Sequence, residues 1–149
     1  MTQLTVLKFG GTSLASAERI SRVAQIVIRA SEDARVAVVV SAMGGVTSDL
    51  IEASDLAAQG DEAYLAVLDR VIALHEEPLA SLVPERDRER VQAAYHAWAE
   101  ELENRLHGIA LVRECSRRTL DAVLAFGELV SSALLASALR QSGADAEAV

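Results

Sequence analysis

The chain has 149 residues, and 51% of them are apolar, which is enough material for one buried core in a single globular domain. The formal net charge is −8 and the cationic side chains are scattered, so the sequence offers no basic stripe for nucleic acid or anionic lipid. Cys115 is the single cysteine, which excludes an intramolecular disulfide and fits a reducing compartment.

The first forty residues have the pattern of a strand, a glycine turn, a helix and a second strand. Residues 4–9 mix apolar and β-branched side chains and end at a glycine pair, as a short strand does. Apolar residues then recur at helical spacing over residues 20–28, with Ser16 as the expected N-cap. Residues 35–41 are almost continuously apolar, which is typical of a parallel strand covered on both faces. This βαβ unit predicts an α/β fold with a right-handed crossover.

The middle of the chain is predicted to be helical. Thr47 and its two successors supply cap residues for a helix that closes near Gly60. Residues 61–77 and 85–106 are rich in Ala, Leu, Glu and Arg, and two breaks separate them, because a residue that precedes proline is pushed out of the helical region. The expected breaks are at Glu77-Pro78 and Val83-Pro84. Residues 61–106 should therefore form a helical excursion from the α/β core.

The C-terminal part is predicted to contain one more helix and the beginning of a strand. The helix should begin near Gly127 or Glu128 and stop at Gly143. Residues 146–149 are expected to begin a third parallel strand. A sheet of two or three strands is small for this fold class, where about five or six strands are usual.

The loop after the first predicted strand has the features of a phosphate site. Lys8 lies near the C-terminal end of that strand, where open α/β sheets bind ligands. Its ammonium can offset charge on a transferring phosphoryl group, and Gly10 and Gly11 let the backbone approach a phosphate closely. The loop matches neither the P-loop nor the dinucleotide-binding motif. From spacing alone, a structural glycine turn is an equal alternative.

Three polar residues near other predicted turns are candidates for binding a small substrate. Ser41 and Thr47 offer hydroxyls suited to a carboxylate or an amine, although a helix N-cap is the commoner use of a threonine such as Thr47. Glu128 falls in the first turn of the last predicted helix, where a carboxylate is ordinarily explained by the helix dipole. The alternative is a carboxylate that holds a substrate ammonium, and the residues alone leave both interpretations open.

Several classes of chemistry lack support in the sequence. His75, His96 and His107 do not have the spacing of metal ligands, so we expect no metal site built from protein side chains alone. Cys115 has no neighbouring base, and no nucleophile elbow is present for acyl chemistry. No basic segment precedes an apolar run at the N-terminus, and no stretch approaches the length of a membrane-spanning helix. We therefore expect a cytoplasmic protein that contacts neither membrane nor nucleic acid.

Three blocks of sequence resemble the signature motifs of the aspartokinases, in the same order and with similar spacing. They are Val6-Leu7-Lys8-Phe9-Gly10-Gly11-Thr12-Ser13, Val39-Val40-Ser41-Ala42-Met43-Gly44 and Gly127-Glu128-Leu129-Val130-Ser131-Ser132. Residues 106–111 and 118–121 are also similar to the segment that precedes the third block in that family. The resemblance spans essentially the whole chain. The helical excursion is similar to that of the longer aspartokinases, both the monofunctional lysine-sensitive type and those fused to homoserine dehydrogenase.

The resemblance implies a three-layer αβα amino-acid kinase fold, of which residues 1–149 form the N-terminal, substrate-binding lobe. Lys8 would contact the transferring phosphoryl group. The other members of the implied phosphate loop are Gly10, Gly11, Thr12 and Ser13. Ser41, Thr47 and Glu128 would hold L-aspartate, with the glutamate on the α-ammonium.

The implied reaction converts Mg-ATP and L-aspartate into ADP and 4-phospho-L-aspartate by in-line attack of the side-chain carboxylate. This is the first step of the lysine, threonine and methionine pathway, and the intact enzyme is expected to be a homo-oligomer. The family places its ATP lobe and its ACT regulatory domains beyond residue 149, so we expect a fragment that lacks both. The alternatives are another amino-acid kinase, such as acetylglutamate kinase, or a non-catalytic domain that binds a small acid or a partner protein.

Overall fold

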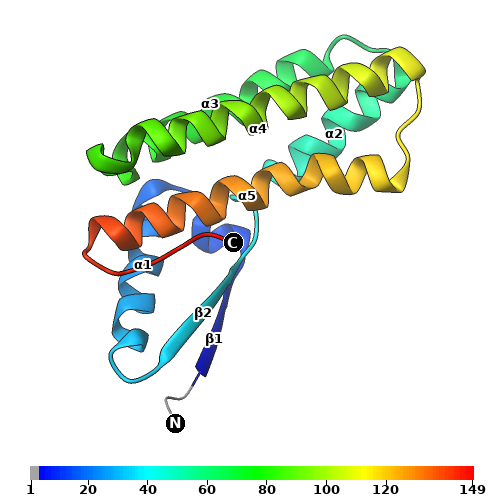
Figure 1. Ribbon diagram of the computed structural model, residues 1–149. Coiled ribbons are helices and arrows are strands. Elements are labelled where there is room, and N and C mark those ends of the chain that lie inside the picture. Colours follow the sequence, from blue (N-terminus) through cyan, green and yellow to red (C-terminus); the bar gives the residue numbers. More distant parts are fainter. Residues whose placement is uncertain (1–3) are drawn as a thin grey trace.

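A βαβ unit opens the fold in the computed structural model, which describes residues 4–149 (Figure 1). Its elements are β1 (Leu4–Phe9), the 3₁₀ turn η1 (Gly11–Leu14), α1 (Ala17–Ser31) and β2 (Arg35–Val40). The strands pair in parallel, with Lys8 opposite Val39. The hydroxyl oxygen of Ser16 caps α1 by accepting a hydrogen bond from the Arg19 backbone N–H at 3.3 Å. Both predicted strands and the predicted cap are confirmed.

Four long helices complete the fold. They are α2 (Val46–Gln59), α3 (Tyr64–Leu82), α4 (Glu85–Val112) and α5 (Arg117–Gln141). α5 lies between the βαβ unit and the α3–α4 pair, and it contacts α1, α2, α3 and α4 (Figure 1). α2 closes at its C-cap Gly60, as predicted, and this residue is left-handed, with φ of 72°. The expected α/β class is confirmed, with most residues in helices.

α5 is the core helix of the molecule. By length and composition it is apolar enough to cross a membrane, which corrects the expectation that no segment approaches this length. However, 61% of its most apolar window is buried against the rest of the protein. Its fully buried side chains include Val123, Val130 and Leu134. Because the helix contacts neighbours on several sides, its apolar character is explained by packing.

The predicted break at Glu77-Pro78 is wrong, because α3 continues through Pro78 to Leu82. Proline removes one backbone donor and disfavours a helix interior. Here Pro78 is buried on the same face as His75 and Leu82, so tertiary packing holds the helix together across the proline. The second predicted break is confirmed. Val83 is extended, with φ of −89° and ψ of 113°, and Pro84 is the N-cap of α4.

The C-terminal prediction is wrong for the start of the last helix and for the third strand, whereas the expected stop at Gly143 is confirmed, because α5 ends at Gln141 and Gly143 has a left-handed φ of 89°. α5 begins at Arg117, where the hydroxyl of Ser116 accepts a hydrogen bond from the Thr119 N–H at 3.1 Å, and Gly127 lies deep inside the helix. Within the described chain the sheet has two strands, and residues 146–149 have no regular secondary structure. The helix start predicted from sequence is too late in the chain, because a glycine such as Gly127 often marks a helix boundary. The N-cap in the structure is Ser116.

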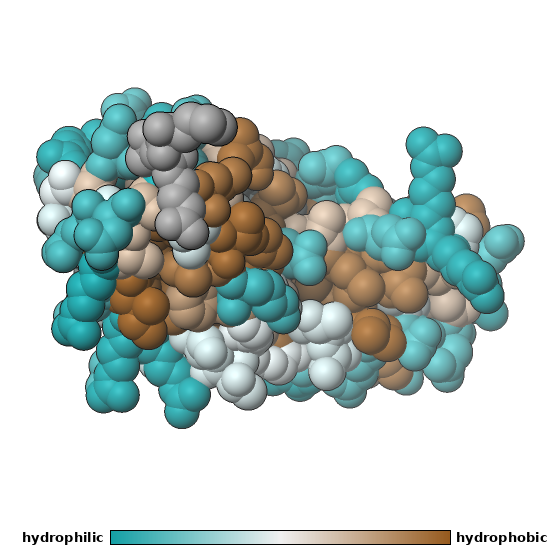
Figure 2. All heavy atoms as spheres, turned by 90° about the horizontal axis from the view of Figure 1, so that it is seen from below, coloured by the Kyte–Doolittle hydropathy of each residue, from teal (hydrophilic) through white to brown (hydrophobic). Residues whose placement is uncertain are grey.

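The sheet has one covered and one bare face within residues 4–149. The side chains of β1 and β2 alternate between half-buried and exposed positions. Leu4, Val6 and Val39 on the bare face are 62%, 63% and 51% exposed. Apolar atoms gather at the end of the molecule where the strands begin (Figure 2). The almost continuous apolar run of β2 predicts that both faces of the sheet are packed against other parts of the protein. Residues 4–149 pack against one face only.

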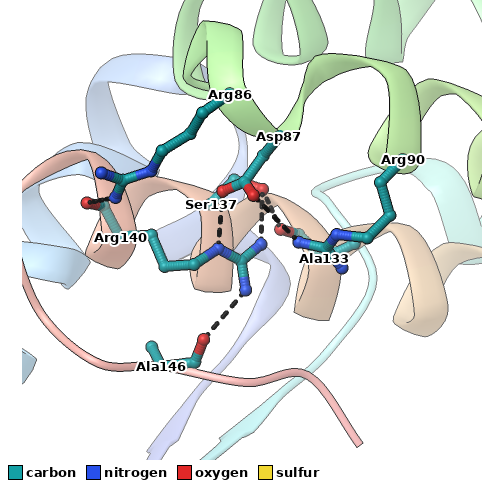
Figure 3. A network of polar contacts seen from close by, with 7 residues as sticks. All are labelled: Arg86, Asp87, Arg90, Ala133, Ser137, Arg140 and Ala146. Atoms are coloured by element: carbon teal, nitrogen blue, oxygen red, sulfur yellow. Dashed lines mark hydrogen bonds and ion pairs between the residues drawn. The ribbon is translucent and has the colours of Figure 1, made fainter.

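An arginine–carboxylate network joins the beginning of α4 to the end of α5 (Figure 3). Arg140 donates from Nε to Asp87 at 2.8 Å and from Nη1 to the Ala146 carbonyl oxygen at 2.9 Å. Arg86 donates to the Arg140 carbonyl oxygen at 2.8 Å. Burial alone would raise the pKa of Asp87, but the hydrogen bonds from Arg140 and Arg90 outweigh this effect and leave the pKa lowered. The network fixes the C-terminal segment along α5.

His75 is a buried polar residue in the helical half of the core. Its Nδ1 lies 2.7 Å from the Val71 carbonyl oxygen, and its Nε2 has no partner among the described residues. Its ring centroid is 6.2 Å from that of Tyr95 and 5.6 Å from that of Phe126. Burial lowers the pKa of His75, and the hydrogen bond to Val71 opposes this effect only in part. The imidazole is therefore neutral in the folded protein near neutral pH.

This burial predicts a loss of stability in mild acid. Unfolded His75 titrates near its ordinary pKa of 6.5, while the folded residue takes up its proton only at lower pH. Below pH 6.5 the unfolded state therefore binds more protons, and the free energy of unfolding falls by at most about 1.4 kcal/mol per pH unit. Urea unfolding between pH 7.5 and 5.5 measures the slope. His75→Leu should flatten it, whereas His107→Gln at an exposed position should not, and an unchanged slope in His75→Leu would contradict the assignment.

Candidate functional site

The loop that follows β1 is held in one conformation with the Lys8 side chain beside it. Lys8 is exposed and is the only lysine in the sequence. A β-carbon added at Gly10 would lie 3.8 Å from Lys8 Nζ, so the ammonium lies beside the glycine turn. The Ser13 N–H donates to the Gly10 carbonyl oxygen at 3.0 Å, and Arg19 Nη1 donates to the Thr12 carbonyl oxygen at 2.6 Å. The backbone of the glycine turn and the Lys8 ammonium therefore lie next to each other in this loop.

The loop that follows β2 begins by extending the parallel pairing. The Ser41 N–H donates to the Phe9 carbonyl oxygen at 3.1 Å. α2 then begins at Val46, and its N-cap is Gly45, whose φ of 92° favours glycine. Thr47 is the second residue of α2, with an exposed side chain. The interpretation of Thr47 as the helix cap is therefore wrong, and its hydroxyl lies on the surface beside the loop.

The two loops are in direct backbone contact. A β-carbon added at Gly11 would lie 2.9 Å from the Ala42 carbonyl oxygen. A β-carbon added at Gly44 would lie 3.2 Å from the Ala15 β-carbon and 3.3 Å from the Gly11 carbonyl oxygen. Contacts this short leave no space for larger side chains at Gly11. The two loops therefore lie side by side where the two parallel strands end.

α5 contacts the second loop through Gly127. A β-carbon added at Gly127 would lie 2.6 Å from the Ala42 β-carbon and 2.9 Å from Val46 Cγ1. We call the contact among Gly11, Ala42, Val46 and Gly127 the Ala42 junction. Glu128 is the exposed neighbour of Gly127 and lies well inside α5, which begins at Arg117. The explanation of Glu128 by a helix N-terminal dipole is therefore wrong, because that effect is confined to the first turn.

Sequence neighbours of the predicted site residues meet at the Ala42 junction. Ser41 adjoins Ala42, Thr47 adjoins Val46, and Glu128 adjoins Gly127. The Lys8 loop enters the same junction through Gly11. The arrangement offers an ammonium and backbone N–H groups to an anion. The residues next to the junction carry a carboxylate and two hydroxyls, which are groups that hydrogen-bond small polar molecules.

Three residues at this edge were missed by sequence reasoning. Arg19 fixes the first loop through the Thr12 carbonyl, and a cation in the first turn of the following helix was the available signal. Ala42 is the small residue on which the other segments pack. Ser131 lies one helical turn after Gly127, is fully buried, and has no hydrogen-bond partner for its hydroxyl within residues 4–149. Small residues at i and i+4 mark the face of α5 that approaches the loop.

The residues present fit the phosphate end of a nucleotide. Gly10 and Gly11 are half-buried, and the Lys8 ammonium beside Gly10 is a cation of the kind that binds a phosphate. In the part of the chain that the structure describes, no group of three or more His, Cys, Asp or Glu side chains could hold a metal ion.

Comparison with known proteins identifies the family. The amino acid kinase family matches residues 3–149. The chain belongs to the amino acid kinase family.

Within this family, the similar proteins are aspartokinases. The chain is 35% identical over 139 residues to bifunctional aspartokinase/homoserine dehydrogenase 1, chloroplastic, of Zea mays, with 93% of this chain and 15% of the relative covered. It is 33% identical over 141 residues to aspartokinase 1, chloroplastic, of Arabidopsis thaliana, with 95% of this chain and 24% of the relative covered. The resemblance inferred from the three sequence blocks is confirmed.

Solved structures of E. coli aspartokinase III share the fold. The structure in complex with lysine and aspartate (T-state) has a TM-score of 0.80 and 28% identity. The structure in complex with aspartate and ADP (R-state) has a TM-score of 0.78 and the same identity. Each alignment covers 95% of this chain and 30% of that protein. The chain therefore spans less than a third of the proteins it resembles.

The Ala42 junction predicts opposite effects for two glycine substitutions. Gly127→Ala places a methyl group 2.6 Å from the Ala42 β-carbon, and overpacking of this kind costs about 1–3 kcal/mol. Gly108→Ala in α4 is the matched control, because nothing lies within 4 Å of the added carbon. That control should stabilise the protein by about 0.5–1 kcal/mol, the helix preference of Ala over Gly. Thermal unfolding measures both, and equal stabilisation by the two variants would contradict the close approach.

Proposed function

We propose that this chain forms the substrate-binding part of an aspartate kinase, which transfers the γ-phosphoryl group of ATP to the side-chain carboxylate of L-aspartate and yields 4-phospho-L-aspartate. The Ala42 junction is the observation that supports the proposal, because the lysine loop, the second loop and α5 meet there, and Ser41, Thr47 and Glu128 are sequence neighbours of the residues in contact. The likeness to aspartokinase III, whose solved complexes contain aspartate and ADP, supports this choice of substrates.

Lys8 acts on the phosphoryl group in this proposal. Its ammonium neutralises the charge that develops as the γ-phosphoryl group moves in line from ADP to the aspartate carboxylate. The glycine loop, Gly10 to Ser13, contributes backbone N–H groups that approach the phosphate without steric hindrance. Arg19 is a positioning residue, because it holds the loop through the Thr12 carbonyl oxygen. The carboxylate attacks directly, so no enzyme-bound intermediate is required.

L-Aspartate is bound by the second loop and α5. Glu128 accepts hydrogen bonds from the α-ammonium, and Ser41 and Thr47 donate from their hydroxyls to its carboxylates. A fixed position near the phosphoryl group supplies most of the rate enhancement in such a transfer.

ATP and Mg²⁺ complete the proposed site. Mg²⁺ would offset the charge of the β- and γ-phosphates when bound. We propose that the residues that hold adenosine and Mg²⁺ belong to a further lobe, and that ACT regulatory domains follow, because the chain covers 30% of aspartokinase III. The bare sheet face of Leu4, Val6 and Val39 is the proposed contact surface of that lobe.

The pathway, the oligomeric state and the cellular location of the intact enzyme are also proposed from the resemblance to aspartokinases. The reaction is the first step of the lysine, threonine and methionine pathway, and the intact enzyme is a homo-oligomer. The plant relatives are named chloroplastic. We propose that this chain is located in the cytoplasm. The free thiol of its single cysteine agrees with a reducing compartment.

Aspartate binding by the 149-residue chain tests the role of Glu128. Glu128→Gln should weaken L-aspartate binding about 10-fold or more in isothermal titration calorimetry, since a hydrogen bond between charged groups contributes about 1.5–3 kcal/mol. Glu114→Gln, at an exposed position before α5, is the control and should leave affinity unchanged. Succinate lacks the ammonium and should be insensitive to Glu128→Gln. Equal weakening for succinate and aspartate would show that Glu128 does not contact the ammonium.

Turnover tests the role of Lys8 and requires a complete enzyme. In a chimera, residues 1–149 replace the corresponding segment of E. coli aspartokinase III, and hydroxylamine traps the acyl phosphate formed from aspartate, ATP and Mg²⁺. Lys8→Ala should lower kcat about 10²–10³-fold, as loss of a charge-stabilising donor does. Arg22→Ala, which disrupts only an exposed ion pair with Glu18, should retain kcat. Undiminished kcat in Lys8→Ala, with the fold checked by circular dichroism, would refute this role.

A further inference from the structure

An apolar groove of about 570 Å³ lies between α3 and α4, away from the Ala42 junction. Its floor is a stripe of α3 at helical spacing: Leu65, Leu68, Ile72 and Leu79. Leu65 is 44% exposed. Tyr95 of α4 lines the groove from the other side, and its hydroxyl donates to the Ile72 carbonyl oxygen at 3.3 Å. The two helices are thus tied together below an apolar surface that is open to solvent.

Carboxylates surround this floor. Asp69 and Glu76 of α3 and Glu100 and Glu103 of α4 line the groove. No lysine or arginine is among the described lining residues. Burial, with a smaller contribution from the charge of Glu76, raises the pKa of Tyr95 to about 12. The phenol therefore adds no charge, and the groove is an anionic surface with an apolar centre.

These four carboxylates have no ion-pair partner within residues 4–149. Elsewhere on the protein, acidic side chains pair with arginines. Asp49 and Glu52 share Arg70 at 2.8 Å, and Glu85 pairs with Arg88 at 2.6 Å. Because four like charges line one groove without an ion-pair partner within residues 4–149, a cationic partner would gain favourable electrostatic energy there.

The dimensions of the groove favour a helix as the occupant. On α3 the lining extends from Leu65 to Ala80, which corresponds to about 22 Å at 1.5 Å per residue. On α4 it extends from Gln92 to Glu103, or about 17 Å. An amphipathic helix of about 12–15 residues matches this length, and such helices bind in apolar grooves through side chains at i, i+3, i+4 and i+7.

We propose that the α3–α4 groove binds an amphipathic helix of a partner protein that has an apolar stripe bordered by lysines or arginines. Apolar side chains of the partner would cover the leucine and isoleucine floor, and its cations would pair with the four carboxylates. A second copy of this chain fits poorly, because its net charge of −8 is of the same sign as the groove. No residue of the proposed aspartate site lies on α3 or α4.

A designed peptide tests the groove. The probe is a fluorescent 15-residue helix with leucines at i, i+3, i+4 and i+7 and lysines on both borders, titrated against the 149-residue chain and followed by fluorescence anisotropy. A peptide of the same composition with scrambled order removes the stripe and retains the charge. We expect the ordered peptide to bind at least about 10-fold more tightly and to shift the methyl resonances of Leu65, Ile72 and Leu79.

Variants locate the binding site. Glu100→Lys with Glu103→Lys should weaken the ordered peptide at least about 10-fold, and Leu65→Gln should weaken it as well. The matched controls are Glu32→Lys near the end of α1 and Leu111→Gln, which is 71% exposed on α4 outside the groove. Both controls should change affinity less than twofold. All variants should bind aspartate as the original chain does, which separates this test from that of the proposed function.

Three outcomes would overturn the proposal. Equal binding of ordered and scrambled peptides would mean that only net charge attracts them. An equal loss of peptide affinity in the groove variants and the control variants would mean that the peptide binds outside the groove. Concentration-dependent dimerisation that Leu65→Gln abolishes, without peptide binding, would assign the groove to a second copy.

Discussion

The close approach of three segments at Ala42 is the constraint on which the candidate site depends. Gly11 and Gly127 contact this residue at distances that exclude a β-carbon. The first loop thereby packs against the second, and the middle of α5 packs against Ala42 of the second loop and against Val46, the first residue of α2. Because interiors are packed densely and transmit small displacements, a change of one methyl group at this point alters the relative position of the two loops. The side chains proposed to act on phosphate and on aspartate are neighbours of this contact.

α5 links the contact at Ala42 to the other helices of the protein. It contacts the βαβ unit and the helical excursion at once, and Arg140 near its end is bound to Asp87 of α4. The helical layer is consequently one packed unit with the loop edge. The sheet is different, since Leu4 and Val6 remain exposed on its bare face. This asymmetry agrees with a chain that covers 30% of aspartokinase III, where further residues are available to cover a sheet face.

Much of the fold follows from local sequence patterns. Strands β1 and β2, the Ser16 cap and the Gly60 helix end were predicted because each depends on residues close together in the chain. Two of the errors share one cause. Pro78 and Gly127 have the local chemistry of helix boundaries, yet both lie inside helices because burial against distant segments outweighs local preference. The third strand was expected from a short apolar segment, for which no partner strand exists within residues 4–149.

The sequence by itself determined the βαβ unit, the lysine–glycine loop and the family resemblance, since periodicity and motif spacing are properties of neighbouring residues. The tertiary structure decided the rest of the site. Glu128 lies in a helix interior, whereas the sequence predicted a helix end. Thr47 lies on the surface of α2, whereas the sequence favoured a helix cap. The tertiary structure also created the α3–α4 groove, whose carboxylates are spread over two helices. The physical reason is that Ala42 and Gly127 meet only through packing between segments far apart in the chain, and no local pattern encodes such a contact.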